Sequence, residues 1–317
     1  MSDVPHLRFP EFSGEWEKCK LGDIATGFDY GMNAAAKPFD GENKYIRITD
    51  IDEASSTYID KDIVSPDGTL TENYLVNDRD ILLARTGAST GKSYLYRKSD
   101  GKLYYAGFLI RANVTKHNPY FVFSQLHTHR YWSWVSIMSA RSGQPGINSQ
   151  EYSSFPVYVT SLREEEKISA LLSIIDERIA TQNKIIEDLK ILKSAIIERA
   201  YSNRSCHSCR IGDVIEQISE RNKDKSIDMV LSVSNKQGFI NQSEQFEDRI
   251  IASEDTSNYK IVHKNDFAYN PARINVGSIA RLTTIDTGIV SPMYICFRVK
   301  NGVATEYMEH FFSTSYF

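Results

Sequence analysis

The sequence predicts an α+β protein in which two similar mixed α/β domains are separated by a long, coiled-coil-forming α-helix. Three observations predict this architecture: an internal repeat of domain size, a stretch without glycine or proline between the two copies, and short β-like runs among turn residues in each copy. We therefore expect a first domain at residues 1–160, a helix at 161–203 and a second domain at 204–317. In a chain of 317 residues, each copy is long enough to bury its own core.

The repeat is clearest where residues 75–93 read LVNDRDILLARTGASTGKS and residues 261–279 read IVHKNDFAYNPARINVGSI. The two segments lie about 186 residues apart, far more than the roughly 20–50 residues of a solenoid unit. Asp80 then aligns with Asp266, and Gly91 aligns with Gly277. Upstream, LGDI at 21–24 is matched by IGDV at 211–214. A repeat of this size indicates two copies of one domain.

Within each copy, short runs of strand-forming residues are bounded by glycine, asparagine and aspartate turns. The expected strands are 44–48, 81–84 and 109–114 in the first copy, and 229–233, 267–269 and 294–299 in the second. Asn118 followed by Pro119 is typical of a helix N-terminus, so we predict one helix from 119 to 135. Strands and helices do not alternate regularly, which favours a mixed or largely antiparallel sheet in each copy.

Residues 161–201 form the predicted long helix, which opens with Ser161 and Glu164 in the spacing of a capping box. Apolar side chains recur in a heptad pattern, interrupted at Gln182 and Lys193. The expected partner-helix seam comprises Ile168, Leu172, Ile175, Ile179, Gln182, Ile186, Leu189 and Ile196. A helix of roughly 60 Å has two interpretations: a spacer packed on its own two domains, or one half of a helical pair whose partner comes from elsewhere.

Composition argues against several classes of protein. A net charge of −4 and a pI of about 6.0 are not those of a uniformly basic nucleic-acid binder, although they are compatible with a locally basic face. The sequence has no run of about 18 apolar residues and no signal-like start, so we expect no membrane association. Four cysteines do not make a disulfide framework, and a cytoplasmic location is the default expectation.

Two motifs resemble catalytic sites but lack parts that the chemistry needs. Residues 87–93, GASTGKS, are one residue shorter than a phosphate-binding loop, and the repeat copy has no lysine there. The Asn-Pro pairs at 118–119 and 270–271 lack the second proline of the amino-methyltransferase motif, and no glycine-rich turn for a methyl donor follows a strand. We therefore expect no nucleotide site, no methyltransferase activity and no cofactor.

The cysteines and histidines do not indicate a metal or catalytic centre either. Cys206, His207 and Cys209 supply three of the four ligands that a structural zinc site needs, so we expect no metal. His127 and His129 lie among aromatic residues of a predicted helix, where packing or a surface position is the simpler interpretation. No serine or cysteine nucleophile with a partner is evident, and the chain is predicted not to be an enzyme.

A polar, glycine-containing loop after the 81–84 strand remains, and its composition suits contact with DNA. Arginine and lysine suit guanine, asparagine suits adenine, and hydroxyl groups suit either bases or phosphates. The residues expected to contact DNA are Arg85, Thr86, Ser89, Thr90, Lys92, Arg97 and Lys98 in the first copy, Asn270, Arg273 and Asn275 in the second, and Gln144 and Asn148 in another glycine-rich loop. The alternatives are a solvated hairpin for the first loop and a domain cap for the 141–148 loop.

Taken in order, these motifs resemble a known family. The opening LRFPEF…W…LGDI, then DILLARTGASTGKS, GQPGINSQEY…FPV and SLREEEKISALLSIIDERI look like the specificity subunit of type I restriction-modification systems over essentially the whole chain. The resemblance implies two target recognition domains, each of which reads one half of a split double-stranded DNA target, with long helices that fix the gap. It also implies a non-catalytic subunit that holds adenine methyltransferase subunits and, through them, motor–nuclease subunits.

The sequence departs from this family plan at its end. By the repeat, Phe317 corresponds to about residue 131, so we expect a second domain without the counterpart of 131–201. That region of the first copy holds the GQPGIN loop, the last strand and the long helix. An alternative is therefore a truncated, half-type or inactive or regulatory specificity subunit, two copies of which would dimerise through residues 161–201.

Overall fold

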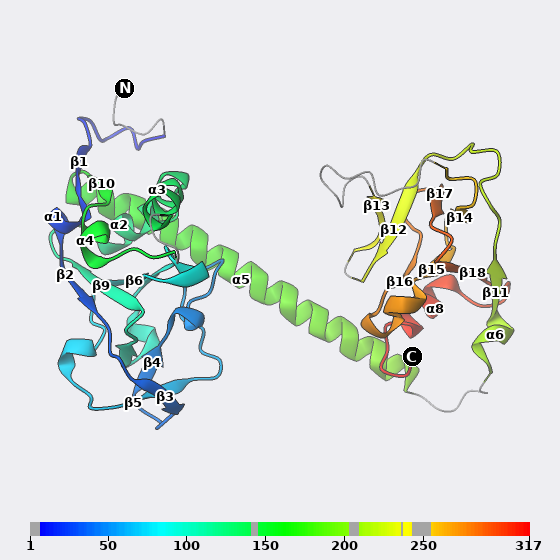
Figure 1. Cartoon of the computed structure of the whole chain (residues 1–317), viewed down its shortest axis with the longest axis horizontal. Coiled ribbons are helices and arrows are strands. Elements are labelled where there is room, and N and C mark those ends of the chain that lie inside the picture. Colours follow the sequence, from blue (N-terminus) through cyan, green and yellow to red (C-terminus); the bar gives the residue numbers. More distant parts are fainter. Residues whose placement is uncertain (1–6, 141–144, 203–208, 236, 243–254) are drawn as a thin grey trace. The chain divides into compact units, whose positions relative to one another are not determined.

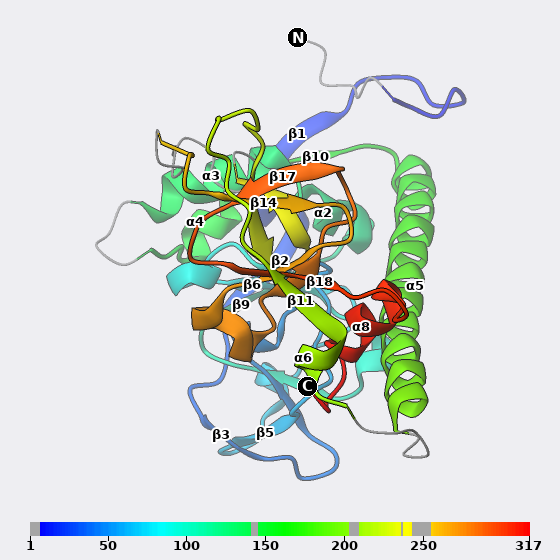
Figure 2. The same ribbon diagram turned by 90° about the vertical axis from the view of Figure 1, so that its right-hand side faces the viewer.

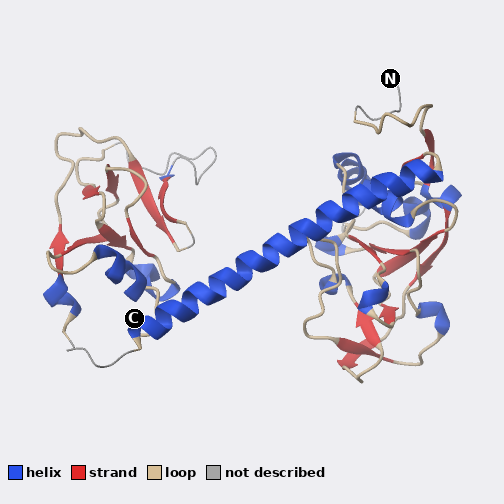
Figure 3. Ribbon diagram, turned by 180° about the vertical axis from the view of Figure 1, so that it is seen from behind, coloured by secondary structure: helices blue, strands red, loops and turns tan. Residues whose placement is uncertain are grey.

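The computed structural model describes residues 7–140, 145–202, 209–235, 237–242 and 255–317, without the side chains of residues 275 and 276. Gln144, Cys206 and His207, which were singled out above, lie outside the described residues. The chain divides into unit 1, Met1–Lys184, and unit 2, Ile185–Phe317, and the boundary falls within helix α5 (Leu162–Tyr201). Both units are mixed α/β, as predicted, and α5 is the one long helix of the described chain (Figures 1 and 3).

Unit 1 is built on an antiparallel sheet with the strand order β2-β9-β6-β7. These strands are β2 (Ala25–Tyr30), β6 (Asp80–Ala84), β7 (Ser93–Leu95) and β9 (Leu109–Val114). Strand β6 is buried along its whole length, because alternate side chains enter two different cores. Ile81 and Leu83 belong to one hydrophobic cluster, whereas Leu82 and Ala84 belong to the other.

Smaller pairings complete unit 1. Strand β1 (Glu17–Lys20) pairs with β10 (Pro156–Val159), β3 (Ala35–Pro38) pairs with β5 (Val64–Asp67), and β4 (Lys44–Ile46) runs parallel to β8 (Leu103–Tyr105). The short helical elements are α1 (Leu21–Ile24), η1 (Ile48–Asp50), η2 (Glu72–Tyr74), η3 (Gly87–Ser89), η4 (Lys98–Asp100) and α4 (Ser149–Ser153).

The single helix predicted over 119–135 is wrong, because two helices occupy this segment. They are α2 (Pro119–Gln125) and α3 (His129–Ser139). Asn118 caps α2 as expected, and its Oδ1 accepts from the backbone NH groups of Tyr120 and Phe121. Thr128 then starts the second helix, since its hydroxyl accepts from Tyr131 N at 3.3 Å and donates to Gln125 O at 2.7 Å.

Unit 2 repeats the main sheet of unit 1 with the order β11-β18-β15-β16. The strands are β11 (Ile215–Ile218), β15 (Phe267–Tyr269), β16 (Ile279–Arg281) and β18 (Ile295–Val299), so the repeat seen in the sequence is a repeat of topology. Figure 2 shows α6 (Ile211–Val214) leading directly into β11. In the chain order of unit 1, β2 likewise follows directly after α1. Helix α8 (Thr305–Phe311) is the counterpart of α2 by its position after the last sheet strand.

A second sheet of unit 2 has the order β13-β12-β17-β14. Its strands are β12 (Val230–Ser234), β13 (Gly238–Asn241), β14 (Lys260–His263) and β17 (Thr287–Val290), and η5 (Pro271–Val276) follows β15. Strands β12 and β17 are parallel, like β4 and β8 in unit 1. The predicted strands of both copies are therefore found, with ends shifted by up to two residues.

Helix α5 starts differently from the predicted capping box. Ser161 Oγ does accept from Glu164 N at 3.3 Å, but the Glu164 carboxylate does not return to Ser161. It accepts from Arg8 Nε at 2.7 Å and Nη2 at 2.8 Å, and from Trp16 Nε1 at 3.3 Å. The next carboxylate, Glu165, accepts from His117 Nδ1 and Asn118 N, each at 2.8 Å. Both glutamates are buried, so they attach the N-terminal segment and the start of α2 to α5.

The apolar seam of α5 is largely open to solvent. Ile168 and Leu172 are half-buried, whereas Ile175, Ile179, Ile186, Leu189 and Ile196 are exposed by 45–60%. Such a stripe on an isolated helix is unfavourable in water unless another surface covers it. In the part of the chain that the structure describes, no helix is both long and apolar enough to cross a membrane.

Candidate nucleic-acid interface

The two loops that were predicted separately in unit 1 lie against each other. Ile147 N donates to Arg85 O at 2.9 Å, and Gly87 N donates to Pro145 O at 3.0 Å. Thr86 and Gly146 form an isolated antiparallel bridge between these contacts. The joined loops line a cavity of about 250 Å³, whose walls are Arg85, Thr86, Met138, Gly146, Ile147, Asn148 and Glu151. We call Arg85, Thr86 and Asn148 with this cavity the Arg85 surface.

The Arg85 guanidinium lies over the ring of Tyr30, with its Cζ 4.6 Å from the ring centroid. Tyr30 Oη in turn accepts a hydrogen bond from Ser149 N at 3.3 Å, and this bond lowers the pKa of Tyr30. The Arg85 backbone is also held, since its NH donates to Phe108 O at 3.0 Å. Tyr30 was not predicted from the sequence, because a tyrosine far from the loop gives no sign of meeting it.

Asn148 is exposed and caps α4, where its Oδ1 accepts from Glu151 N at 2.9 Å. Glu151 Oε2 accepts from Asn148 N at 2.9 Å, which completes a capping box. The Asn148 amide nitrogen has no hydrogen-bond partner among the described residues. Its carbonyl oxygen is therefore occupied, while its NH2 group is free to donate.

The segment 87–93 does not form a phosphate cradle. The backbone NH groups of Thr90, Gly91 and Lys92 donate to the carbonyls of Gly87, Ala84 and Ser89, so they do not converge on a ligand. Thr90 is buried, and its hydroxyl donates to Gly87 O at 2.8 Å. Ser89 is half-buried, and Lys92 Nζ is half-buried at 3.9 Å from Glu53 Oε1. Thr90 therefore has a structural role, whereas Ser89 and Lys92 are half-buried, as Arg85 is.

Arg97 and Lys98 are exposed, but they lie away from the Arg85 surface. Strands β6 and β7 are antiparallel, with Ile81 opposite Leu95 and Leu83 opposite Ser93. Arg97 thus follows the strand end beside Asp80, whereas Arg85 follows the other end of β6. At about 3.3 Å per residue, the length of β6 separates the two groups by roughly 15 Å. The predicted contact residues of unit 1 therefore form two separate patches.

The equivalent loop of unit 2 has a different local structure. Asn270 is buried, and its Oδ1 accepts from Ala272 N at 3.0 Å as the N-cap of η5. Arg273 is exposed on η5, while the side chain of Asn275 lies outside the described atoms. Arg273 is therefore the accessible cationic residue of this loop that the sequence singled out.

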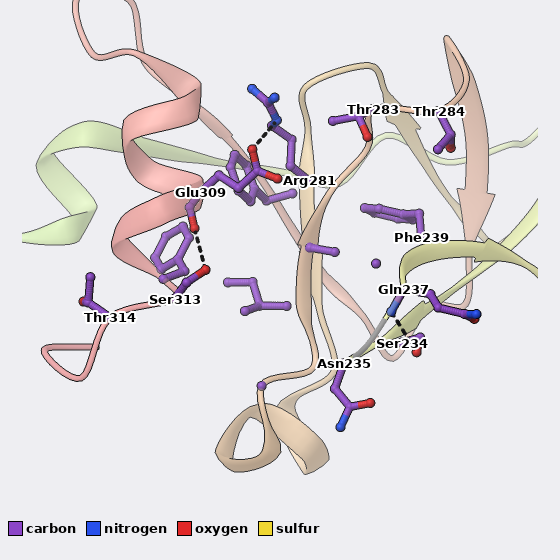
Figure 4. A pocket seen from close by; sticks show the side chains of 16 residues that line it. Ser234, Asn235, Gln237, Phe239, Arg281, Thr283, Thr284, Glu309, Ser313 and Thr314 are labelled. Carbon is purple, nitrogen blue, oxygen red and sulfur yellow. Dashed lines mark hydrogen bonds and ion pairs between the residues drawn. The ribbon is translucent and has the colours of Figure 1, made fainter. Parts of the chain in front are cut away.

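Unit 2 also contains a larger, polar cavity of about 600 Å³ between β16, α8 and the β12–β13 hairpin (Figure 4). Arg281 Nε pairs with Glu309 Oε2 at 3.1 Å along one wall, and Gly277 lies at another. In unit 1, a Cβ on the equivalent Gly91 would lie 2.8 Å from Val135 and 2.9 Å from Trp132 of α3. A Cβ on Gly277 would meet no described atom within 4 Å. Gly277 therefore borders the cavity, whereas Gly91 packs against α3.

Within the described ranges, no three histidine, cysteine, aspartate or glutamate side chains come together as a metal site. Cys209 is exposed, and Cys296 is buried in the core of unit 2, where burial raises the pKa of its thiol to about 11.

Residues 13–190 match the family model described as the type I restriction modification DNA specificity domain. A curated relative, the type I restriction enzyme MjaVIII specificity subunit of Methanocaldococcus jannaschii, is 24% identical over 216 residues, which cover 66% of this chain and 48% of the relative. The chain thus spans about half the length of that relative.

Two solved structures share the fold. The type I restriction-modification S subunit from M. genitalium aligns with a TM-score of 0.56 at 13% identity, over 98% of this chain and 81% of that chain. A chain from work titled as the structural basis of complex assembly and conformational transition of the type I R-M system aligns with a TM-score of 0.50 at 12% identity, over 98% and 80%.

Proposed function

The chain belongs to the family of type I restriction modification DNA specificity domains, and on this premise we propose that it supplies the DNA sequence specificity of a type I restriction-modification complex. The proposed ligand is double-stranded DNA with a split target, of which each unit reads one half. The chain contributes no catalytic step and no cofactor in this proposal.

The observation that carries the proposal is the repeated sheet with a polar loop after the same strand in each copy. In unit 1, the Arg85 surface presents a guanidinium, a hydroxyl and a free amide NH2 group within one small area. In unit 2, Arg273 and Asn275 follow the equivalent strand. Groups of this kind read base edges, while the exposed Arg97 and Lys98 suit phosphate contacts.

The seam of α5 supports a second part of the proposal, which concerns protein partners. Five exposed apolar seam residues require a covering surface, and Gln182 among them would select one register of helix pairing. We infer that residues 161–203 dock methyltransferase subunits and, through them, motor–nuclease subunits. The flanking segments 1–160 and 204–317 would then act as the two DNA-reading domains.

The same stripe favours an alternative, in which two copies of this chain dimerise through residues 161–201 as a half-type or regulatory specificity subunit. Each helix would cover the seam of the other, and the two copies of unit 1 would read a symmetric target. Sedimentation of the chain alone separates the two ideas. A dimer supports self-association, and a monomer that assembles only with methyltransferase subunits contradicts it.

DNA selection tests the main proposal. The chain, assembled with its methyltransferase subunit, is mixed with a duplex library containing a long randomised segment, and bound DNA is recovered at physiological salt and sequenced. We expect enrichment of two short blocks separated by an unselected gap. A phosphate contact adds affinity for any sequence, so Arg97→Ala should weaken binding to all duplexes and reduce the dependence of affinity on salt concentration. A base contact adds specificity, so Arg85→Ala should reduce selection within one block. Recovery of unselected sequences only would contradict the proposal.

A further inference from the structure

Tyr30 stands at the end of β2, where the neighbouring segment 105–110 holds the backbone. It pairs with Ile110 of β9 in the register of the main sheet. The following residue, Gly31, donates from its NH to Leu109 O at 3.1 Å. A Cβ on Gly31 would lie 2.3 Å from Ala106 O, so the chain approaches the 105–107 segment as closely as only glycine allows. The base of the Tyr30 side chain is therefore held in one place.

The phenol of Tyr30 joins three segments of unit 1. Its ring lies under Arg85, which follows β6, and its hydroxyl accepts from the first NH of α4 at Ser149. Tyr30 as a whole residue keeps 41% of its surface exposed, so the contact with Arg85 does not bury it in the core. The core tyrosine Tyr152 of the same unit is, by contrast, fully buried.

Arg85 has a fixed backbone and a side chain that the ring orients. Both its NH and its carbonyl make hydrogen bonds within unit 1, to Phe108 O and from Ile147 N. Among the described residues, no acidic side chain forms an ion pair with its guanidinium. A guanidinium that lies over an aromatic ring keeps its NH groups at its edge, and this edge matches the paired acceptors O6 and N7 of guanine.

We propose that Tyr30 is a positioning residue for base recognition, which holds the Arg85 guanidinium ready to bind the edge of a guanine. This inference rests on the proposed function and adds a residue and a base class to it. Pre-ordering of Arg85 lowers the entropy lost on binding, so the benefit appears in affinity for the target and not in affinity for random DNA.

The test is a double-mutant cycle on DNA affinity. The probes are the duplex most enriched by the selection described above and a shuffled duplex of the same composition, and the protein is the full chain with its methyltransferase subunit. The variants are Tyr30→Ala, Arg85→Ala and the double variant, with Tyr30→Phe as the matched control that keeps the ring. We expect Tyr30→Ala to weaken target binding by roughly 3- to 10-fold and to leave binding to the shuffled duplex unchanged. Thermal unfolding of each variant checks that unit 1 remains folded.

The cycle separates this inference from the function that it rests on. Tyr30→Phe keeps the ring and loses only the bond from Ser149 N, so it should retain more target affinity than Tyr30→Ala. The double variant should be no weaker than Arg85→Ala alone, because the ring acts through the arginine. Additive losses from Tyr30→Ala and Arg85→Ala would overturn the positioning role while leaving Arg85 as a contact. If Arg85→Ala itself leaves the target-to-shuffled ratio unchanged, the proposed role of the Arg85 surface is wrong.

Discussion

Asp80 in unit 1 and Asp266 in unit 2 make the same turn at the start of the same strand. Each is buried and accepts from the backbone NH three residues earlier, at 2.7 Å from Asn77 and 2.8 Å from His263. Each follows a residue with positive φ, 71° at Arg79 and 74° at Asn265. Their second partners differ, since Asn113 Nδ2 donates to Asp80, whereas Arg298 donates to Asp266 from Nε at 2.6 Å and Nη2 at 2.9 Å.

This difference predicts unequal responses to the same substitution. Burial raises the pKa of Asp80, so the folded state favours the neutral carboxyl more than the unfolded state does. The contribution of Asp80 to stability therefore declines as the pH rises through the raised pKa. Asp80→Asn should therefore change stability at neutral pH by less than about 1 kcal/mol, whereas Asp266→Asn should cost about 2–3 kcal/mol by weakening a charge-assisted pair. Native-state hydrogen exchange at β6 and β15 measures both, and equal losses would contradict the argument.

A second matched pair is Gly91 and Gly277, which both have positive φ, 96° and 79°. Alanine at either position is strained by about 1–2 kcal/mol. At Gly91 the new methyl would also press on Val135 and Trp132, which adds about 1–3 kcal/mol, while at Gly277 it would meet open space. Gly91→Ala should therefore lower the stability of unit 1 more than Gly277→Ala lowers that of unit 2. Native-state hydrogen exchange at β6 and β15 measures both losses.

The start of α5 predicts a pH dependence. The hydrogen bonds from Arg8 hold the pKa of Glu164 below its ordinary value of 4.5, so its stabilising contribution is complete above that pH and is lost as the pH falls through the lowered pKa. Glu164→Gln should cost about 1–3 kcal/mol at pH 7, and the gap to the wild type should close in acid. Urea unfolding followed by tryptophan fluorescence measures this, because Trp16, Trp132 and Trp134 all lie in unit 1. The exposed neighbour Glu166 provides the control Glu166→Gln, which should have little effect at either pH.

The exposed seam of α5 is the surface that we expect partner subunits to cover. Ile179→Asp places a charge within the seam, whereas Lys184→Asp places one on the opposite side of the helix by the heptad pattern. We expect Ile179→Asp to abolish association with methyltransferase subunits, or with a second copy, and Lys184→Asp to retain it. Size-exclusion chromatography with light scattering reports the assembly, and similar behaviour of the two variants would exclude the seam as an interface.

The family resemblance and the mixed α/β fold with a long helix were predictable from the sequence, and both are confirmed. The two-domain architecture was predictable from the repeat, because the alignment of Asp80 and Gly91 with Asp266 and Gly277 indicates that the domain occurs twice. Local signals failed where a tertiary contact decides the outcome. Thr128 divides the predicted 119–135 helix by capping a new one, and Glu164 leaves its capping box for Arg8, which is distant in the sequence.

The candidate interface was predictable in part for a similar reason. Residue type suggested Arg85, Arg97 and Lys98 as one group, but strand direction separates the last two from Arg85. Asn148 was predicted in a separate loop, which the fold brings against Arg85. Thr90 has a structural role because its hydroxyl donates to Gly87 O, a contact that depends on the folded conformation of the loop. Tyr30 joins the site through a contact across the sheet, which no local sequence pattern records.

The buried carboxylates of Glu164 and Glu165 also fix the rotational orientation of α5 about its own axis. Each is tied to a different part of unit 1, one to Arg8 and the other to His117 and Asn118, so together they prevent α5 from rotating about its own axis at its origin. The direction in which Ile168, Leu172 and Ile175 face is therefore fixed relative to the part of unit 1 that contains Arg85. Because an α-helix turns by about 100° per residue, one residue inserted after Glu166 would swing the seam to another side, while seven would restore it to within about 20°.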